Sequence, residues 1–419
     1  MEGTKGLVVV ILMVALAPIA TAGVSRWVRV PTVVVEILLG VLAGPDVLGW
    51  IDRDGPVVGG LSEFGLVMLM FLAGYEIDVP RIKGRPLRSA AAGWAVSLVL
   101  GLGAGLLMSL VVEGATMTGV AIGLTLTTTA LGTFLPIIRD AGLLPTPLGA
   151  RIMAIGTVGE FAPIVAIALL LSGRHPGATI AALAVFALLA AATVLLAVRP
   201  NPPWLDRVVE RTLHSSGQLA IRLAMLLTVV LVWFADELEL DNLLGAFTAG
   251  VALRLSLTHT PGALVEMISA KLDGIGFGFF VPIFFVMSGV RFDLDALLGD
   301  PKLIALIPVI LLLFLVVRGV PTYVLAGRGE LADRRRELAL FASTALPLIV
   351  VITNIAIENE YLTGGTAAAL VGAGMLSVLV FPQLALRTAG DDATGPHPQG
   401  FDAPEEPPGD DEEEVLRDR

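Results

Sequence analysis

The stretch FLAGYEIDV at residues 71–79 has a counterpart, VMSGVRFDL, at residues 286–294. The two stretches share a glycine and, four residues later, an aspartate. Another short match, TTTAL at 127–131 with ASTAL at 342–346, lies at the same offset of 215 residues. Two matches in one order and at one offset indicate that the chain contains an internal duplication.

The composition is that of a protein that crosses a membrane many times. The chain has 419 residues, 55% of them hydrophobic and 16% charged, and its mean hydropathy is +0.85. A soluble protein of this length could not bury so much apolar surface. The chain has no cysteine, which excludes disulfides and thiolate metal sites, and its four histidines are too scattered to form a metal cluster.

Motifs of enzymes and of nucleotide-binding proteins are missing from the sequence. We find no phosphate-binding loop, no dinucleotide fingerprint and no nucleophile elbow. We therefore expect neither an enzyme nor a resident cofactor, and we expect no nucleic-acid partner.

Hydropathy predicts thirteen membrane spans, each of about 17–25 residues. Their approximate limits are 6–24, 30–49, 60–77, 87–112, 115–138, 148–172, 177–198, 217–236, 242–257, 272–290, 303–326, 337–357 and 364–386. The first span could instead be a signal peptide, because it ends in Ala20-Thr21-Ala22, a pattern typical of a cleavage site. Its leading residues carry one Lys balanced by one Glu, which favours a retained span.

Basic residues distinguish the two faces of the predicted membrane domain. Most of the 27 Lys and Arg residues lie in or beside the odd-numbered loops. The even-numbered loops contain only Arg53, Arg174, Arg291 and Lys302. Because cytoplasmic loops are enriched in Lys and Arg, we expect the odd loops inside, the N-terminus outside and the C-terminus in the cytoplasm.

The repeat period covers seven spans, which is an odd number, so the two halves enter the membrane in opposite directions. The predicted fold is an all-α polytopic membrane protein with two inverted six-helix repeats joined by a linker helix. Inverted repeats are typical of secondary transporters, whose substrate sites lie near the membrane midplane. We therefore assign residues 1–387 to one membrane transporter domain.

The remaining residues, 388–419, are rich in acidic residues, proline and glycine and contain little that could be buried. Such a composition predicts a disordered acidic cytoplasmic tail. A regulatory or partner-binding tail is the alternative interpretation.

Two spans carry helix-breaking residues at places related by the repeat. The first contains TLTTTALGT at 125–133, including Thr128 and Thr129, and the second contains Ser343, Thr344 and Pro347. Each hydroxyl could simply bond to its own helix and each proline could make a simple kink. Because the pattern occurs twice, we expect two discontinuous helices that cross and frame a polar site.

Two charged residues lie well inside predicted spans, Glu160 in TVGEFAPIVAIAL (157–169) and Arg318 in LLLFLVVRGVPTYVLAG (311–327). Intramembrane charges are expensive and usually functional. Arg318 could instead extend toward the cytoplasmic surface, and Glu160 could be a hydrogen-bonded structural group. A carboxyl group placed between helix ends could bind either a proton or a small cation. Glu36, in the second span, is the next candidate.

At these residues the chain resembles the monovalent cation:proton antiporter superfamily, in the branch of the Kef-type and NapA-type transporters. The resemblance covers residues 6–386. The stretches that carry it are VPTVVVEILLGVLAGPDVLG, LSEFGLVMLMFLAGYEIDV, VPIFFVMSGVRFDL and TLTTTALGTFLPIIRDAGLL. It implies a homodimer with a scaffold (spans about 6–77 and 217–290), a moving core (about 87–172 and 303–386) and a linker span (about 177–198).

The resemblance also implies roles for individual residues. Glu160 would bind the monovalent cation or the proton, with Gly159, Thr128 and Thr129 around it. Arg318, Ser343 and Thr344 would compensate charge at the helix ends. Relatives commonly carry two polar residues where this chain has Gly159-Glu160, and many carry Lys where it has Arg318. Since Arg does not release its proton in proteins, one carboxylate predicts electroneutral exchange of one cation for one proton.

The expected function is therefore Na⁺/H⁺ or K⁺/H⁺ antiport in the cell membrane by alternating access, with a role in pH homeostasis. Two other functions stay open at this point. One is proton-coupled transport of another solute on the same fold, for example an organic anion held by Arg318. The other is a membrane sensor that transports nothing and signals through the tail.

Overall fold

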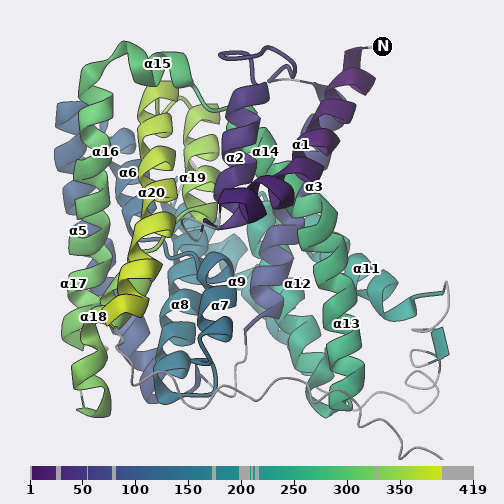
Figure 1. The fold of residues 1–419 in the computed structure, drawn as a ribbon. Helices are drawn as coiled ribbons and strands as arrows, with labels where there is room; N and C mark the ends of the chain where they lie inside the picture. Colours follow the sequence, from purple (N-terminus) through teal and green to yellow (C-terminus); the bar gives the residue numbers. More distant parts are fainter. Residues whose placement is uncertain are drawn as a thin grey trace, which may run out of the picture.

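The computed structural model describes residues 2–24, 30–53, 55–77, 82–171, 176–197, 217–325 and 329–388, together with 208, 211 and 212. This part of the chain is helical throughout, with no strand among the described residues. The predicted tail lies outside the described residues, apart from Thr388. Figure 1 shows the helices standing side by side, with the N-terminus at the upper end.

The helices of the first half follow the predicted spans closely. They are α1 (Glu2–Val24), α2 (Thr32–Ala43), α3 (Pro56–Tyr75), α5 (Arg85–Val111), α6 (Thr116–Leu126), α7 (Leu131–Asp140), α8 (Pro147–Leu170) and α9 (Pro176–Ala197). The span predicted at 30–49 is shorter in the structure, because α2 ends where Gly44-Pro45 follows. Proline has no backbone N–H and cannot continue the helix.

The second half contains two spans interrupted by π-helical turns. The helices are α11 (Leu219–Glu237), α12 (Asn242–Ser256), α13 (Gly262–Ile275), α14 (Val281–Val290), α15 (Leu294–Gly299), α16 (Pro301–Phe314), α17 (Val320–Leu325), α18 (Arg335–Ala342), α19 (Pro347–Glu358) and α20 (Gly364–Thr388). The turn η2 (Gly276–Phe280) joins α13 to α14, and η3 (Leu315–Gly319) joins α16 to α17.

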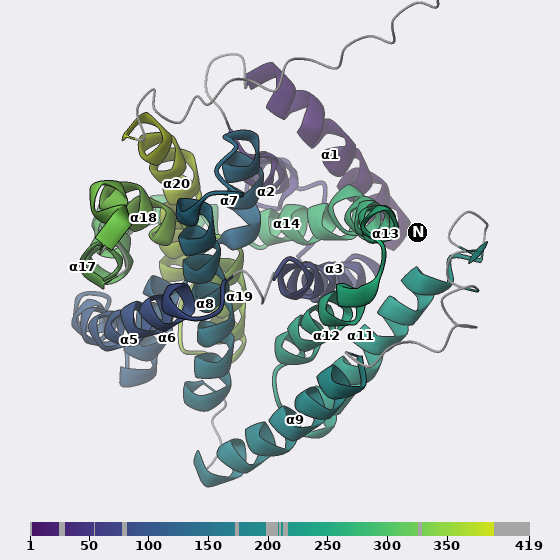
Figure 2. The same cartoon turned by 90° about the horizontal axis from the view of Figure 1, so that it is seen from below.

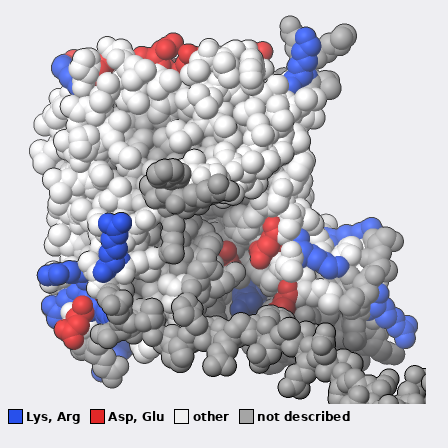
Figure 3. All heavy atoms as spheres, in the orientation of Figure 1, with Lys and Arg blue, Asp and Glu red and all other residues white. Residues whose placement is uncertain are grey.

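Eleven helical segments of the described chain are long and apolar enough to cross a membrane. The helices α2 and α12 are shorter, with 12 and 15 residues. In the space-filling view, a broad band without charged side chains separates charged groups at the top from those in the lower part (Figure 3). The chain is thus a multi-pass membrane protein, as the hydropathy predicted.

Seen from below, the helices form two groups (Figure 2). One contains α1–α3 and α11–α14, and the other contains α5–α8 and α16–α20. The first group is held together by close backbone contacts at glycines. A Cβ atom on Gly74 would lie 2.1 Å from the carbonyl oxygen of Phe247, and one on Gly289 would lie 2.0 Å from that of Ile37. The two glycines aligned in the repeat therefore both allow a neighbouring helix backbone to approach.

Both predicted helix breaks are present in the second group. The backbone leaves the helix between α6 and α7 and again between α18 and α19. The two extended segments meet, because the amide of Ala130 donates to the carbonyl of Thr344 at 2.7 Å. The crossing therefore brings four half-helix ends together within the membrane region. The ends of α6 and α18 carry partial negative charge, and the starts of α7 and α19 carry partial positive charge.

Candidate functional site

Glu160 lies at the start of the half-helix α7. It projects from the middle of α8, and its side chain is only 4% exposed. Its Oε1 atom accepts hydrogen bonds from the amides of Leu131, at 2.9 Å, and Gly132, at 3.4 Å. These amides are unpaired donors of a helix start, and the positive end of the helix dipole favours an anion there. The break between α6 and α7 thus provides hydrogen-bond donors for the carboxylate, which lipid hydrocarbon could not provide.

The second carboxylate oxygen of Glu160, Oε2, differs from Oε1 in its surroundings. It is buried and has no hydrogen-bond partner among the described residues. A buried acceptor without a partner is costly, and in native structures it usually marks a functional group or a missing ligand. A proton on this oxygen or a cation beside it would satisfy it.

Arg318 occupies the opposite, negative side of the crossing. It lies in η3 and is 1% exposed. Its Nε and Nη2 atoms donate to the hydroxyl of Thr129 at 3.0 and 2.7 Å. That hydroxyl donates in turn to the carbonyl of Ala342, the last residue of α18, at 2.7 Å. Among the described residues no carboxylate pairs with Arg318. Its charge therefore faces the negative end of a half-helix through Thr129.

Gly159 explains how an arginine fits at this place. A Cβ atom on Gly159 would lie 2.5 Å from the Cβ and Oγ1 atoms of Thr129 and 2.7 Å from Nη2 of Arg318. Its carbonyl oxygen also accepts the amide of Thr129 at 3.0 Å. The space of a side chain at position 159 is thus filled by the Arg318–Thr129 pair.

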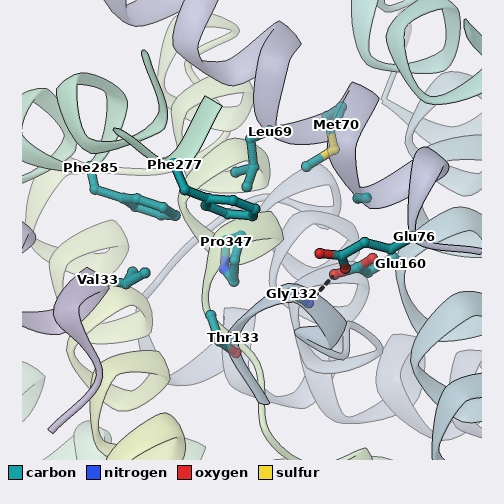
Figure 4. Close-up of a pocket in the computed structure, with 11 residues that line it drawn as sticks. Val33, Leu69, Met70, Glu76, Gly132, Thr133, Glu160, Phe277, Phe285 and Pro347 are labelled. Carbon is teal, nitrogen blue, oxygen red and sulfur yellow. Dashed lines mark hydrogen bonds between the residues drawn. The ribbon is translucent and has the colours of Figure 1, made fainter. Parts of the chain in front are cut away.

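A small cavity of about 30 Å³ lies beside Glu160. Most of its lining comes from α3, α7 and the turn η2, and Figure 4 shows the side chains. Glu76 and Glu160 both line the cavity, and in the view of Figure 4 their carboxylates lie toward the same end of it. Thr133 lines it as well, and its hydroxyl donates to the carbonyl of Ala130, which leaves the oxygen lone pairs available.

The cavity offers the oxygen atoms that a hard monovalent cation would need. They come from two carboxylates, one hydroxyl and any water that enters, and apolar side chains form most of the rest. Among the described residues no cluster of three or more His, Cys, Asp or Glu side chains could hold a metal ion. The arrangement suits weak, reversible binding of a cation better than a permanent metal centre.

The other sequence-predicted residues lie nearby but outside the cavity. Thr128 bonds to the carbonyl of Thr125, Ser343 to that of Ala339 and Thr344 to that of Leu340. These hydroxyls close the last turns of their own half-helices, as the simpler interpretation of the hydroxyl-rich breaks allowed. Glu36 is 5% exposed on α2 and does not line the cavity.

A second, larger cavity lies at the far end of α8. Its volume is about 310 Å³, and its lining includes Glu239, Asp241 and Asn359. Burial raises the pKa of the Asp241 carboxyl, and the nearby charge of Glu358 raises it further, while the amide of Leu243 opposes the shift. Because it lies between the end of α8, the loop from α11 to α12 and the end of α19, this acidic cavity lies between the two helix groups on the side of the even-numbered loops.

The sequence did not single out Glu76 or the aromatic residues of the cavity. Glu76 is the residue directly after α3, near the end of a predicted span. Its place within the repeated stretch 71–79 was the available signal. Phe277 and Phe285 gave no signal, since aromatic residues are ordinary in apolar spans.

Comparison with known proteins shows the family of the chain. The family model described as "Sodium/hydrogen exchanger, transmembrane" matches residues 11–386. YjbQ of Bacillus subtilis (strain 168), provisionally named a Na⁺/H⁺ antiporter, is 27% identical over 399 residues, which are 90% of this chain and 61% of YjbQ. The Na⁺/H⁺-K⁺ antiporter GerN of Bacillus cereus is 24% identical over 278 residues, or 64% of this chain and 67% of GerN. This chain thus spans only part of YjbQ.

The fold has a close counterpart among solved structures. The sodium/proton antiporter MjNhaP1 from Methanocaldococcus jannaschii, solved at pH 8, superposes with a TM-score of 0.66 at 17% sequence identity. The match covers 93% of this chain and 100% of MjNhaP1. At this identity the similarity concerns the fold of the membrane domain.

Proposed function

Because this chain belongs to the sodium/hydrogen exchanger family, we propose that it is a secondary antiporter that exchanges Na⁺ or K⁺ for a proton across the cell membrane. The observation that carries the proposal is the free oxygen Oε2 of Glu160, which faces no hydrogen-bond donor of the described chain. A proton and a cation would compete for this oxygen. Release of either ion without its replacement would leave a buried oxygen with no partner, which costs free energy. Exchange of the two ions is therefore favoured over release of one ion alone.

The proposed cycle needs the site to open to one side at a time. The cavity beside Glu160 borders the last turns of α3, which end at an odd-numbered loop, so we propose that this state is reached from the cytoplasm. The acidic cavity at the far end of α8 would be the approach from outside. Movement of α5–α8 and α16–α20 against the other group would switch access between them.

The same proposal includes the finer architecture. We propose thirteen membrane crossings in two inverted repeats, with the N-terminus outside, the C-terminus inside and a homodimer formed through the scaffold. The equivalent packing of Gly74 and Gly289 supports the repeat, because each glycine lets another helix backbone approach at the same point of its half.

Transport of an organic anion is less compatible with the geometry. Arg318 is 1% exposed, and its hydrogen bonds go to Thr129, Ser97 and Ile155, none of which lines the cavity. The cavity itself presents carboxylates, which repel anions. A cation is therefore the better substrate.

The direct test of the function is ion-driven proton movement in proteoliposomes. Purified protein is reconstituted with an internal pH dye, and an outward or inward gradient of Na⁺ or K⁺ is imposed. We expect the cation gradient to drive protons in the opposite direction. A transporter of another solute, or a sensor, would leave the internal pH unchanged under every cation gradient.

Exchange is expected to be electroneutral. Arg318 cannot release a proton, and Glu160 can hold either one proton or one cation, so each cycle moves one charge each way. Glu76 keeps its charge throughout in this scheme. In a solid-supported membrane assay we expect no steady current from ion gradients and no effect of membrane potential on the rate. A sustained inward or outward current would show that a second proton is carried.

Glu76 is expected to strengthen cation binding without being essential for the exchange. It is half-buried, so water screens its charge more than that of Glu160. We expect Glu76→Gln to raise the cation concentration for half-maximal exchange roughly tenfold, with a maximal rate near that of the wild type. Rates measured across a series of Na⁺ and K⁺ concentrations separate the two effects. An unchanged half-maximal concentration would remove Glu76 from the site.

A further inference from the structure

The π-helical turn η2 places an aromatic ring at the cation cavity. Phe277 lies in this turn and Phe285 lies in α14, and both line the cavity that contains Glu160. In Figure 4 the ring of Phe277 lies between Phe285 and the two carboxylates. Phe285 is 1% exposed, whereas Phe277 is 40% exposed. Of the two rings that line the cavity, Phe277 is therefore the one that is partly exposed.

The π turn is what allows both rings to face the cavity. Residues eight positions apart in an α-helix of 3.6 residues per turn lie about 80° apart around the axis. A π turn contains one additional residue, so eight positions correspond to about seven of an α-helix and the angle falls to about 20°. Without the turn, Phe277 would share a face with Phe284 instead.

Packing against α3 fixes the turn in this orientation. A Cβ atom on Gly276 would lie 2.3 Å from Cδ1 of Leu72, and one on Gly65 would lie 2.3 Å from the carbonyl oxygen of Phe280. The ring of Phe280 also packs edge-on against Phe64, with centroids 4.8 Å apart. The backbone on both sides of Phe277 is thus held close to α3, which fixes the place from which its ring lines the cavity.

The free space beside the ring is small. A cavity of about 30 Å³ is about two to three times what one water needs, which is about 10–15 Å³. It can take a cation that has lost most of its hydration shell, together with about one water. Because the oxygens are on one side and the ring of Phe277 is on another, the position of the ring limits the size of what can reach Glu160.

From this geometry we propose that Phe277 determines cation size selectivity, by excluding ions that are too large or still too hydrated. The inference rests on the proposed function, because it concerns the cation bound beside Glu160. In this proposal the π turn η2 holds the ring of Phe277 in place.

The test compares Phe277→Ala with Phe279→Ala for exchange of Li⁺, Na⁺, K⁺ and Rb⁺ in proteoliposomes. Phe279 is a matched control, since it lies in the same turn and is equally exposed, at 41%, but does not line the cavity. We expect Phe277→Ala to shift the ratio of half-maximal concentrations toward the larger cations by about tenfold, because a missing apolar group in a pocket changes discrimination by that order. An unchanged ratio, or an equal shift in Phe279→Ala, would overturn the proposal.

Cysteine labelling tests the same ring without relying on transport. The natural chain has no cysteine, so a single Phe277→Cys variant carries the only thiol. We expect a membrane-impermeant thiol reagent to modify it, and the smaller cations to slow modification more than the larger ones. Phe284→Cys, at a position 2% exposed, should react poorly with or without cation. If exchange is observed but cations do not affect labelling at position 277, the ring is not at the site and the inference fails. If neither the wild type nor any variant exchanges cations for protons, the proposed function fails instead.

Discussion

Replacing Glu160 by Gln is expected to abolish cation/proton exchange. Gln can still accept the amides of Leu131 and Gly132, so the crossing should keep its geometry. It cannot take up or release a proton, and it cannot neutralise a cation. We expect the exchange rate to fall by roughly 100-fold or more, since removing a buried charged partner costs about 2–5 kcal/mol. Proton flux driven by Na⁺ or K⁺ in proteoliposomes measures the loss.

Glu36→Gln is the matched control for this change. Glu36 is also a buried carboxylate within a span, but it lies outside the cavity. We expect this variant to exchange cations at close to the wild-type rate. If Glu36→Gln abolished exchange while Glu160→Gln preserved it, the ion site would lie on α2 and our assignment would be wrong.

Gly159→Ala is expected to have the second largest effect. The new methyl group would overlap Thr129, whose Cβ atom is rigid, and the buried guanidinium of Arg318. Overpacking of this kind costs about 1–3 kcal/mol. Thr129 lies two residues before the start of α7, so a shift there moves the amides that bind Glu160. We expect a lower melting temperature and at least roughly tenfold slower exchange.

Gly372→Ala provides the comparison for Gly159→Ala. Gly372 lies in α20, within the same helix group, and a Cβ atom there would meet only Cδ1 of Ile307 at 3.6 Å. That is an ordinary contact, so stability and exchange should stay near those of the wild type. Wild-type exchange by Gly159→Ala would show that the Arg318–Thr129 contact does not position the site.

The architecture could be predicted from sequence to a large extent, for identifiable reasons. Apolar runs of membrane length give the spans, and the hydroxyl and proline clusters at 125–133 and 343–347 mark both breaks. The early end of α2 could also have been anticipated from Gly44-Pro45. The π turns were not foreseeable, because GFGFF and LVVRG continue an apolar helix pattern and only tertiary packing selects the wider turn.

The site was predictable only where an isolated charge or a break marked it. Glu160 and Arg318 are conspicuous because hydrocarbon penalises both, and the structure places them at opposite ends of the helix crossing. The hydroxyls were harder to rank. Thr129 joins three elements, whereas Thr128, one residue earlier, only closes its own helix turn. Which threonine faces the crossing depends on where the helix ends, and a run of three threonines does not indicate that.

Glu76 could not be paired with Glu160 from sequence, because their proximity depends on how α3 packs against the core helices. Gly159 is the converse case. The glycine looked like the loss of a ligand, and the structure explains it as room for an arginine. Both points concern space between helices, which hydropathy and spacing do not encode.

The central claim is that one carboxylate, Glu160, is shared by cation and proton, and proton release on cation binding tests it most directly. Purified protein in weakly buffered detergent solution is titrated with Na⁺ or K⁺ while a pH dye and calorimetry record protons released and cations bound. We predict about one proton released for each cation bound in the wild type. We predict no release in Glu160→Gln. Cation binding without proton release, or undiminished release in Glu160→Gln, would contradict the account.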